Sequence, residues 1–150
     1  IKVNNKLSNF FIKKYYLPNL PLRFTKYLLR IANTSIDVSD GLIDDLTKML
    51  NRQNLSFQLS EKEIPISNKL NNLINNKKLK KINLISNGDD YQVVFTAGSK
   101  KSRIIRDISR STGIKISKIG KIISGKNRSH IIDEKGRQIV PKHNGYLHQF

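Results

Sequence analysis

Acidic side chains are concentrated in two short motifs of an otherwise basic chain. Six of the eleven Asp and Glu residues lie there, four in IDVSDGLIDDL (36–46) and two in ISNGDDYQVVF (85–95). Clustered carboxylates repel one another, and a bound cation is the usual relief. Mg²⁺ prefers oxygen ligands and is commonly held by one or two carboxylates together with substrate phosphates. The two motifs therefore predict a metal–phosphate site.

The first motif is expected to run from a strand into a helix. On an extended strand, Asp37 and Ser39 point to the same face, because side chains alternate with a period of two. Ser39 or Asp40 suits the N-cap of the helix, and Gly41 permits a tight turn. A helix N-terminus favours an anion such as a phosphate group. The alternative is that Ser39 and Asp40 only cap the helix and that Asp37 is a surface acid.

The second motif places two acids immediately before an apolar strand. Asn87 and Gly88 are a turn signal, and the strand is expected over 91–96. Adjacent acids such as Asp89 and Asp90 do not favour sheet formation, which indicates a role in binding. The alternative is a turn whose acids are simply solvated.

Hydrophobic spacing predicts the elements that must position these motifs. Helices are expected at about 22–31, 41–51, 66–76 and 100–111, and strands at 33–39, 55–59 and 91–96. One or two strands, broken near Gly120, are expected over 114–123, and a hairpin at 130–140. Residues 1–17 are expected to form a helix packed by its aromatic residues, or an arm that reaches another domain. Strands and helices mix without strict βαβ regularity. The predicted fold class is therefore α+β, a mixed sheet with helices packed mainly on one face.

Composition excludes several classes of protein. The 150 residues suit one domain with a real core, and the absence of Cys excludes disulfides and thiolate metal sites. The three His residues are scattered toward the end of the chain, which argues against a zinc site. No apolar run approaches the ~18–20 residues of a membrane helix, and no signal-peptide layout is present. We expect a cytoplasmic protein without a membrane partner.

The formal net charge of +17 does not by itself indicate a nucleic-acid partner. Lys, Asn and Ile supply 20, 16 and 21 residues, and all three have A/T-rich codons, so genomic base bias can produce the charge. The basic residues are spread along the chain, and there are only eleven Phe and Tyr residues and no Trp for stacking on bases. We expect scattered surface lysines, a local negative patch at the two motifs, and no specific nucleic-acid partner.

Taken in order, the motifs resemble those of thiamine-monophosphate kinases, which share a superfamily with aminoimidazole ribonucleotide synthetase and selenophosphate synthetase. The segment YYLPNLPLRFTKYLLRIANTSIDVSDGLIDDL is similar to the Pro-rich approach and motif helix of that family. SNGDDYQVVFTA is similar to its second motif, IGKI to a later strand, and GYLHQF to its terminal segment. The resemblance spans nearly the whole chain, but it concerns only the C-terminal domain of a longer family pattern.

The resemblance implies an enzyme that uses Mg²⁺ and ATP to phosphorylate thiamine monophosphate, giving thiamine diphosphate. Carried over residue by residue, it implies that Asp37 and Asp40 are ligands of different Mg²⁺ ions and that Ser39 contacts ATP. It also implies that Asp89 and Tyr146 contact thiamine monophosphate. No covalent nucleophile is expected, because phosphoryl transfer relies on positioning and on cations that neutralise developing charge.

The chain departs from the family pattern at three positions of the second motif. Asn87 replaces a Gly, Asp89 replaces a Glu, and Gln92 replaces a later Glu. The shorter Asp89 weakens the assignment of the substrate more than the assignment of the family. Two alternatives therefore stay open: a non-catalytic remnant or binding domain of the family, and a related superfamily enzyme acting on another small phosphorylated substrate.

The resemblance further implies that an N-terminal domain, or a separate chain, completes the Mg²⁺ and ATP sites and supports a dimer. Residues 1–17 would link to that domain, and residues 18–150 would form the C-terminal domain. The chain begins at Ile1 and its single methionine is Met49. We interpret this as a processed product, an unusual start codon or the remnant of a longer protein.

Overall fold

Helices and strands alternate irregularly along the chain in the computed structural model, which describes residues 3–51, 53–76 and 79–145. The helices are α1 (Asn5–Tyr16), α2 (Leu22–Ile31), α3 (Leu42–Met49), α4 (Asn68–Asn75), α5 (Lys81–Leu84) and α6 (Ser102–Thr112), with two 3₁₀ turns, η1 (Glu61–Glu63) and η2 (Ser99–Lys101). The strands are β1 (Thr34–Val38), β2 (Leu55–Ser60), β3 (Gln92–Thr96), β4 (Gly120–Ser124), β5 (His130–Ile132) and β6 (Gln138–Ile139).

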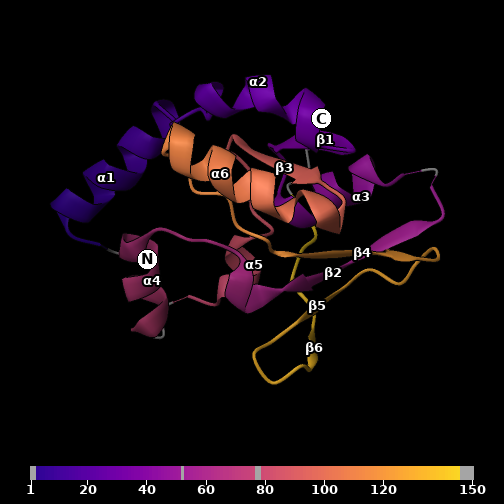
Figure 1. Ribbon diagram of the computed structural model, residues 1–150. Coiled ribbons are helices and arrows are strands. Elements are labelled where there is room, and N and C mark those ends of the chain that lie inside the picture. Colours follow the sequence, from indigo (N-terminus) through magenta and orange to yellow (C-terminus); the bar gives the residue numbers. More distant parts are fainter. Residues whose placement is uncertain (1–2, 52, 77–78, 146–150) are drawn as a thin grey trace, which may run out of the picture.

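These strands form a mixed four-stranded sheet and a separate two-stranded sheet. The larger sheet has the order β4-β2-β5-β6, in which β2 and β5 are parallel and the other pairs are antiparallel. The smaller sheet is the antiparallel pair β1 and β3. In Figure 1, α2, α3 and α6 lie above the four-stranded sheet, on the side that also holds β1 and β3. The predicted α+β class with a mixed sheet is confirmed.

Two apolar clusters hold these layers together. The larger one joins α3 and β1 to the four-stranded sheet, and its buried members include Val38, Leu46, Phe57, Leu59 and Ile131. It therefore fixes the helix of the first acidic motif against both sheets. The smaller cluster packs α2 against α6 through its buried residues, which are Phe24, Ile31 and Ile108.

Most predicted elements are present within a few residues of the expected boundaries. The helix expected at 41–51 is observed as α3, and the expected 130–140 hairpin is the antiparallel pair β5 and β6. Of the one or two strands expected over 114–123, only the part from Gly120 onward forms a strand, β4. The reason is tertiary packing, because Ile114 and Ile116 turn toward the smaller apolar cluster instead of pairing with a neighbouring strand.

The N-terminal residues form a helix, α1, rather than an extended arm. None of the residues of α1, all of which are described, is fully buried. Its contact with the rest of the chain includes the Lys69 ammonium of α4, which lies 3.8 Å from the centroid of the Phe10 ring. No helix in the described part of the chain is both long enough and apolar enough to cross a membrane.

Candidate functional site

The turn between β1 and α3 is held by a carboxylate from inside the helix. Asp45 is 2% exposed, and its Oδ2 accepts hydrogen bonds from the backbone N–H groups of Ser39 (2.9 Å), Asp40 (3.0 Å) and Gly41 (3.2 Å). The prediction that Ser39 or Asp40 caps the helix was wrong: the N-cap is Gly41, which has no side chain. Asp45 takes over this role because its side chain reaches back over the first helical turn.

This arrangement also changes the predicted phosphate contact at the helix end. The three N–H groups of residues 39–41 already donate to Asp45. A phosphate group at this turn would therefore depend mainly on bound cations rather than on those N–H groups.

Three carboxylates of the first motif form a compact group. One oxygen from each of Asp40, Asp44 and Asp45 lies within 4.8 Å of the others. Mg²⁺ binds oxygen at about 2.0–2.1 Å, so neighbouring ligands of one octahedral ion lie about 2.9 Å apart and opposite ligands about 4.2 Å apart. The three carboxylates could therefore hold a divalent ion together after they move inward. Asp37 is not a member of this group, which is compatible with the expectation that Asp37 and Asp40 serve different ions.

The Lys48 ammonium contacts the same three carboxylates. Its Nζ lies 2.5 Å from Asp40 Oδ2, 2.7 Å from Asp44 Oδ2 and 3.4 Å from Asp45 Oδ1. Hydrogen bonding to Asp40, followed by hydrogen bonding to Asp44, raises the pKa of Lys48 above its usual value. The ammonium therefore neutralises part of the negative charge of the motif.

Backbone hydrogen bonds join the second motif to the first. The N–H of Tyr91 donates to the carbonyl of Val38 (2.9 Å), and the N–H of Asp89 donates to the carbonyl of Ser39 (2.8 Å). The N–H of Leu42 in turn donates to the carbonyl of Ile85 (3.1 Å). The antiparallel pairing of β1 with β3 thus continues beyond the strands and brings two motifs that are distant in sequence into contact.

Two glycines allow this close approach. A Cβ on Gly88 would lie 2.1 Å from the Ser39 carbonyl oxygen, and a Cβ on Gly41 would lie 2.6 Å from the Ser86 carbonyl oxygen. Gly41 also has a φ of +126°, which side chains with a Cβ rarely adopt. Each motif therefore needs its glycine where the backbone of the other motif passes.

The backbone of the second motif is strained beside these contacts. Asp89 and Tyr91 have positive φ values of 65° and 51°, a conformation that is uncommon outside glycine and often found at functional sites. The Tyr91 hydroxyl donates to Asp89 Oδ1 at 3.3 Å. The negative charge of Asp89, and then this hydrogen bond, raise the pKa of Tyr91, with smaller contributions from Tyr15 and Asp37.

The neighbouring acid, Asp90, is shifted toward its protonated form. Desolvation, and then the charge of Asp89, raise the pKa of Asp90, although Asp90 remains an exposed residue.

The structure places four of the five predicted site residues around the joined motifs. Asp37 is exposed on β1, Ser39 and Asp40 lie in the turn after it, and Asp89 is bonded to that turn through its backbone. Tyr146 lies outside the described residues. The last described residue before it, Gly145, is close to the first motif, because a Cβ there would lie 2.6 Å from the Cβ of Asp44.

From the sequence we also expect Asp37, Asp40 and Asp89 to face one cleft, because metal and substrate contacts must serve one reaction. This stays a prediction. Two cavities of about 750 and 430 Å³ are present among the described residues, and none of the three acids lines either of them. The smaller cavity reaches the second motif through Ser86 and Asn87.

Sequence reasoning gave no role to Asp45 or Lys48. A signal for Asp45 was present, since it falls on the apolar face of α3 together with Leu42, Leu46 and Met49, where an acid needs a specific partner. The spacing of Asp44 and Lys48 by four residues is a signal for an ion pair on a helix.

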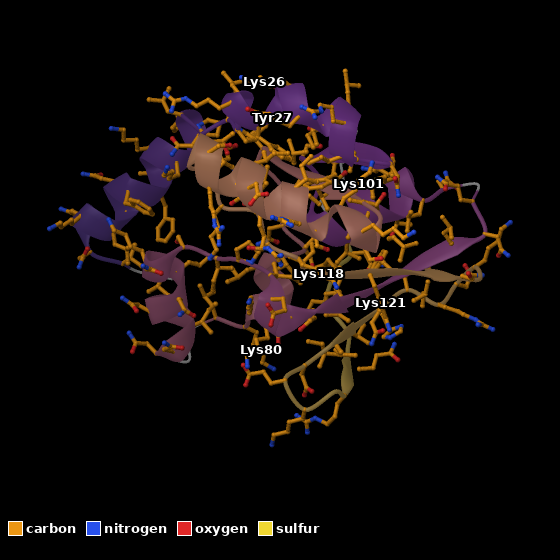
Figure 2. The ribbon with its side chains drawn as sticks, viewed as in Figure 1. Lys26, Tyr27, Lys80, Lys101, Lys118 and Lys121 are labelled. Atoms are coloured by element: carbon orange, nitrogen blue, oxygen red, sulfur yellow. The ribbon has the colours of Figure 1, made fainter. Side chains whose placement is uncertain are left out.

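Positive charge is distributed differently from the acids. Figure 2 shows that its labelled lysines belong to separate parts of the fold: Lys26 on α2, Lys80 before α5, Lys101 in η2, and Lys118 and Lys121 before and in β4. The acids of the first motif gather in one group. The expectation that lysines are scattered over the whole surface, with a local negative patch at the two motifs, stays a prediction.

Comparison with known proteins shows which proteins the chain resembles. No protein-family model matches the chain. Thiamine-monophosphate kinase from Buchnera aphidicola subsp. Schizaphis graminum is 32% identical over 146 residues, which is 97% of this chain and 44% of the relative. The crystal structure of the kinase from Stenotrophomonas maltophilia superimposes with a TM-score of 0.70 and 24% identity, covering 87% of this chain and 41% of that one.

A further structure, AaThiL complexed with AMPPCP and TMP, superimposes with the same TM-score of 0.70 at 20% identity and covers 98% of this chain and 44% of that one. The chain therefore spans somewhat less than half of the length of the proteins it matches. By sequence and by fold, this chain is a homologue of the thiamine-monophosphate kinases.

Proposed function

We propose that this chain is the C-terminal part of a cytoplasmic kinase that transfers the γ-phosphate of ATP to thiamine monophosphate. The observation that carries the proposal is the contact between the two acidic motifs, in which the Asp89 N–H donates to the Ser39 carbonyl. This backbone contact would bring the acids of both motifs to one region, where metal and substrate would meet. The complex of the similar AaThiL with AMPPCP and TMP supports an ATP-like nucleotide and thiamine monophosphate as ligands.

Each site residue would have a separate binding task. Asp37 and Asp40 would bind different Mg²⁺ ions, and the Ser39 hydroxyl would contact ATP. Asp89 and Tyr146 would contact thiamine monophosphate. Bound Mg²⁺ would neutralise charge on the transferred phosphoryl group.

Two further interactions would keep these side chains in place. Asp45 fixes the 39–41 turn through three hydrogen bonds. The Tyr91 hydroxyl holds the Asp89 carboxylate. Both interactions would orient the binding groups before the substrates arrive, as catalysis by positioning requires.

We also propose that a segment corresponding to the remaining part of the kinase relatives completes the site and supports a dimer. Residues 1–17 would link to that segment, and residues 18–150 would form the C-terminal domain. Large apolar side chains exposed on α1, α2 and the residues between them support such a contact; they include Tyr16, Leu17, Leu20, Leu22 and Leu29. In Figure 1, α1 and α2 follow one outer edge of the fold. Exposed large apolar side chains, where they form a contiguous patch, mark interaction sites.

A kinase assay tests this proposal. We expect the chain alone to form little or no thiamine diphosphate from ATP, Mg²⁺ and thiamine monophosphate. Adding the part of the Buchnera relative that has no counterpart here, as a separate polypeptide, should restore turnover. Asp40→Asn should then lower turnover by about 100-fold or more, because a carboxylate ligand of the Mg²⁺ that would neutralise the phosphoryl charge is lost.

Asp107→Asn is the matched control, since Asp107 is an exposed acid on α6, outside both motifs. It should leave turnover unchanged. Robust turnover by the chain alone would contradict the proposed division of the site. No turnover with a folded partner would favour the non-catalytic binding domain, and turnover only with another phosphorylated substrate would favour the related superfamily enzyme.

A further inference from the structure

Lys48 lies where a metal ion at Asp40 would have to bind. We propose that Lys48 is a built-in competitor for this metal, so that a divalent ion binds Asp40 only after the ammonium has been displaced. Lys48 would then set the metal affinity of the site. The inference rests on the proposed function, because it takes Asp40 as a metal ligand.

The competition follows from shared atoms. The carboxylates that could hold a divalent ion are those of Asp40, Asp44 and Asp45, and the Lys48 Nζ contacts one oxygen of each. Mg²⁺ must approach such oxygens to about 2.0–2.1 Å. An ammonium 2.5 Å from Asp40 Oδ2 occupies that approach and repels a second cation.

The geometry also indicates which partner moves. Asp45 is 2% exposed and fixed by three backbone donors, so it cannot leave the group without exposing those donors. The Lys48 side chain is 47% exposed, and its flexible stem lets the ammonium swing into solvent. The side chains of Asp40 and Asp44 are 25% and 35% exposed, so an ion can reach them from solvent.

The formal charge of the carboxylate group favours a divalent ion over the Lys48 ammonium. Three carboxylates and one ammonium leave the group with a formal charge of −2. Replacing the ammonium by a divalent ion would leave −1, which reduces the repulsion among the carboxylates. Removing the ammonium without supplying a metal would leave −3, so Lys48 also stabilises the metal-free turn.

The test is Mn²⁺ binding to the full chain, followed by electron paramagnetic resonance, with Lys48→Met. Methionine keeps an unbranched stem and removes the charge. The variant should bind Mn²⁺ at least about tenfold more tightly than the wild type, because no cation has to be expelled. It should also unfold at a lower temperature without metal, and Mn²⁺ should raise its Tm more than that of the wild type.

Lys121→Met is the matched control, because it removes one charge from an exposed residue of β4. It should leave both the Mn²⁺ affinity and the Tm unchanged. Lys48→Gln, which retains a hydrogen-bond donor, should shift the affinity in the same direction as Lys48→Met, and it provides the measurement should methionine prevent folding.

The outcomes separate this inference from the proposed function. If the wild type and Lys48→Met bind Mn²⁺ with equal affinity, Lys48 does not compete with the metal and the inference is overturned. If Asp40→Asn abolishes binding in both, Asp40 nevertheless remains a metal ligand. Mn²⁺ binding that survives Asp40→Asn in both backgrounds would overturn the inference and also count against the metal role of Asp40.

Discussion

Asp45→Ala is expected to lower the free energy of unfolding by about 3–5 kcal/mol. The substitution removes the acceptor of three backbone N–H groups at the turn after β1 and one partner of Lys48. Buried donors that lose their acceptor keep the cost of desolvation without the compensating bond. Urea unfolding followed by circular dichroism measures the effect.

Asp44→Ala is the matched control for this prediction. Asp44 is the preceding residue of the same helix, its side chain is 35% exposed, and it pairs with the same lysine. An exposed ion pair contributes about 0–1 kcal/mol, so the control should change stability by no more than that. Equal losses for the two variants would show that Asp45 does not hold the turn.

Gly88→Ala is expected to lower the free energy of unfolding by about 3 kcal/mol or more, at the upper end of the usual cost of overpacking. The new Cβ would lie 2.1 Å from the carbonyl oxygen of Ser39, which is backbone and cannot rotate away. The second motif must therefore move from the first, and the Asp89 N–H bond to Ser39 should lengthen or break. Urea unfolding and the chemical shift of the Asp89 amide report the two effects.

Gly98→Ala provides the comparison. A Cβ at Gly98 would have no heavy atom within 4 Å, and its φ of −62° suits any residue. Alanine there should be neutral or stabilise the fold by up to about 1 kcal/mol, because it restricts the unfolded chain. Similar losses at Gly88 and Gly98 would contradict the close packing of the two motifs.

Local patterns predicted the elements well where the signal lies within one segment. The apolar spacing of α3 is such a signal, and its observed range differs from the predicted one by only a few residues. Packing between distant segments overrode the local pattern elsewhere. Ile114 and Ile116 have the alternation of a strand, yet they pack in the cluster of α2 and α6.

The sequence predicted that the two motifs serve one site, but it did not predict the backbone contact that joins them. The pairing of β1 with β3 joins them, and no periodicity within either motif specifies which strand becomes its partner. The role of Asp45 was missed for a related reason. The choice of Ser39 or Asp40 as the cap followed sequence preference, whereas the acceptor comes from a buried side chain one turn further along α3.

The most direct test of the account is paramagnetic broadening of backbone amide signals by Mn²⁺ in the ¹⁵N-labelled chain. The two acidic motifs should share one metal-binding region, because their backbones are bonded to each other. Signals from residues 38–42 and 88–91 should therefore broaden together, at lower Mn²⁺ concentration than those of the hairpin that carries Asp133 and Glu134. Broadening that begins at the hairpin, or that reaches one motif without the other, would contradict a common site.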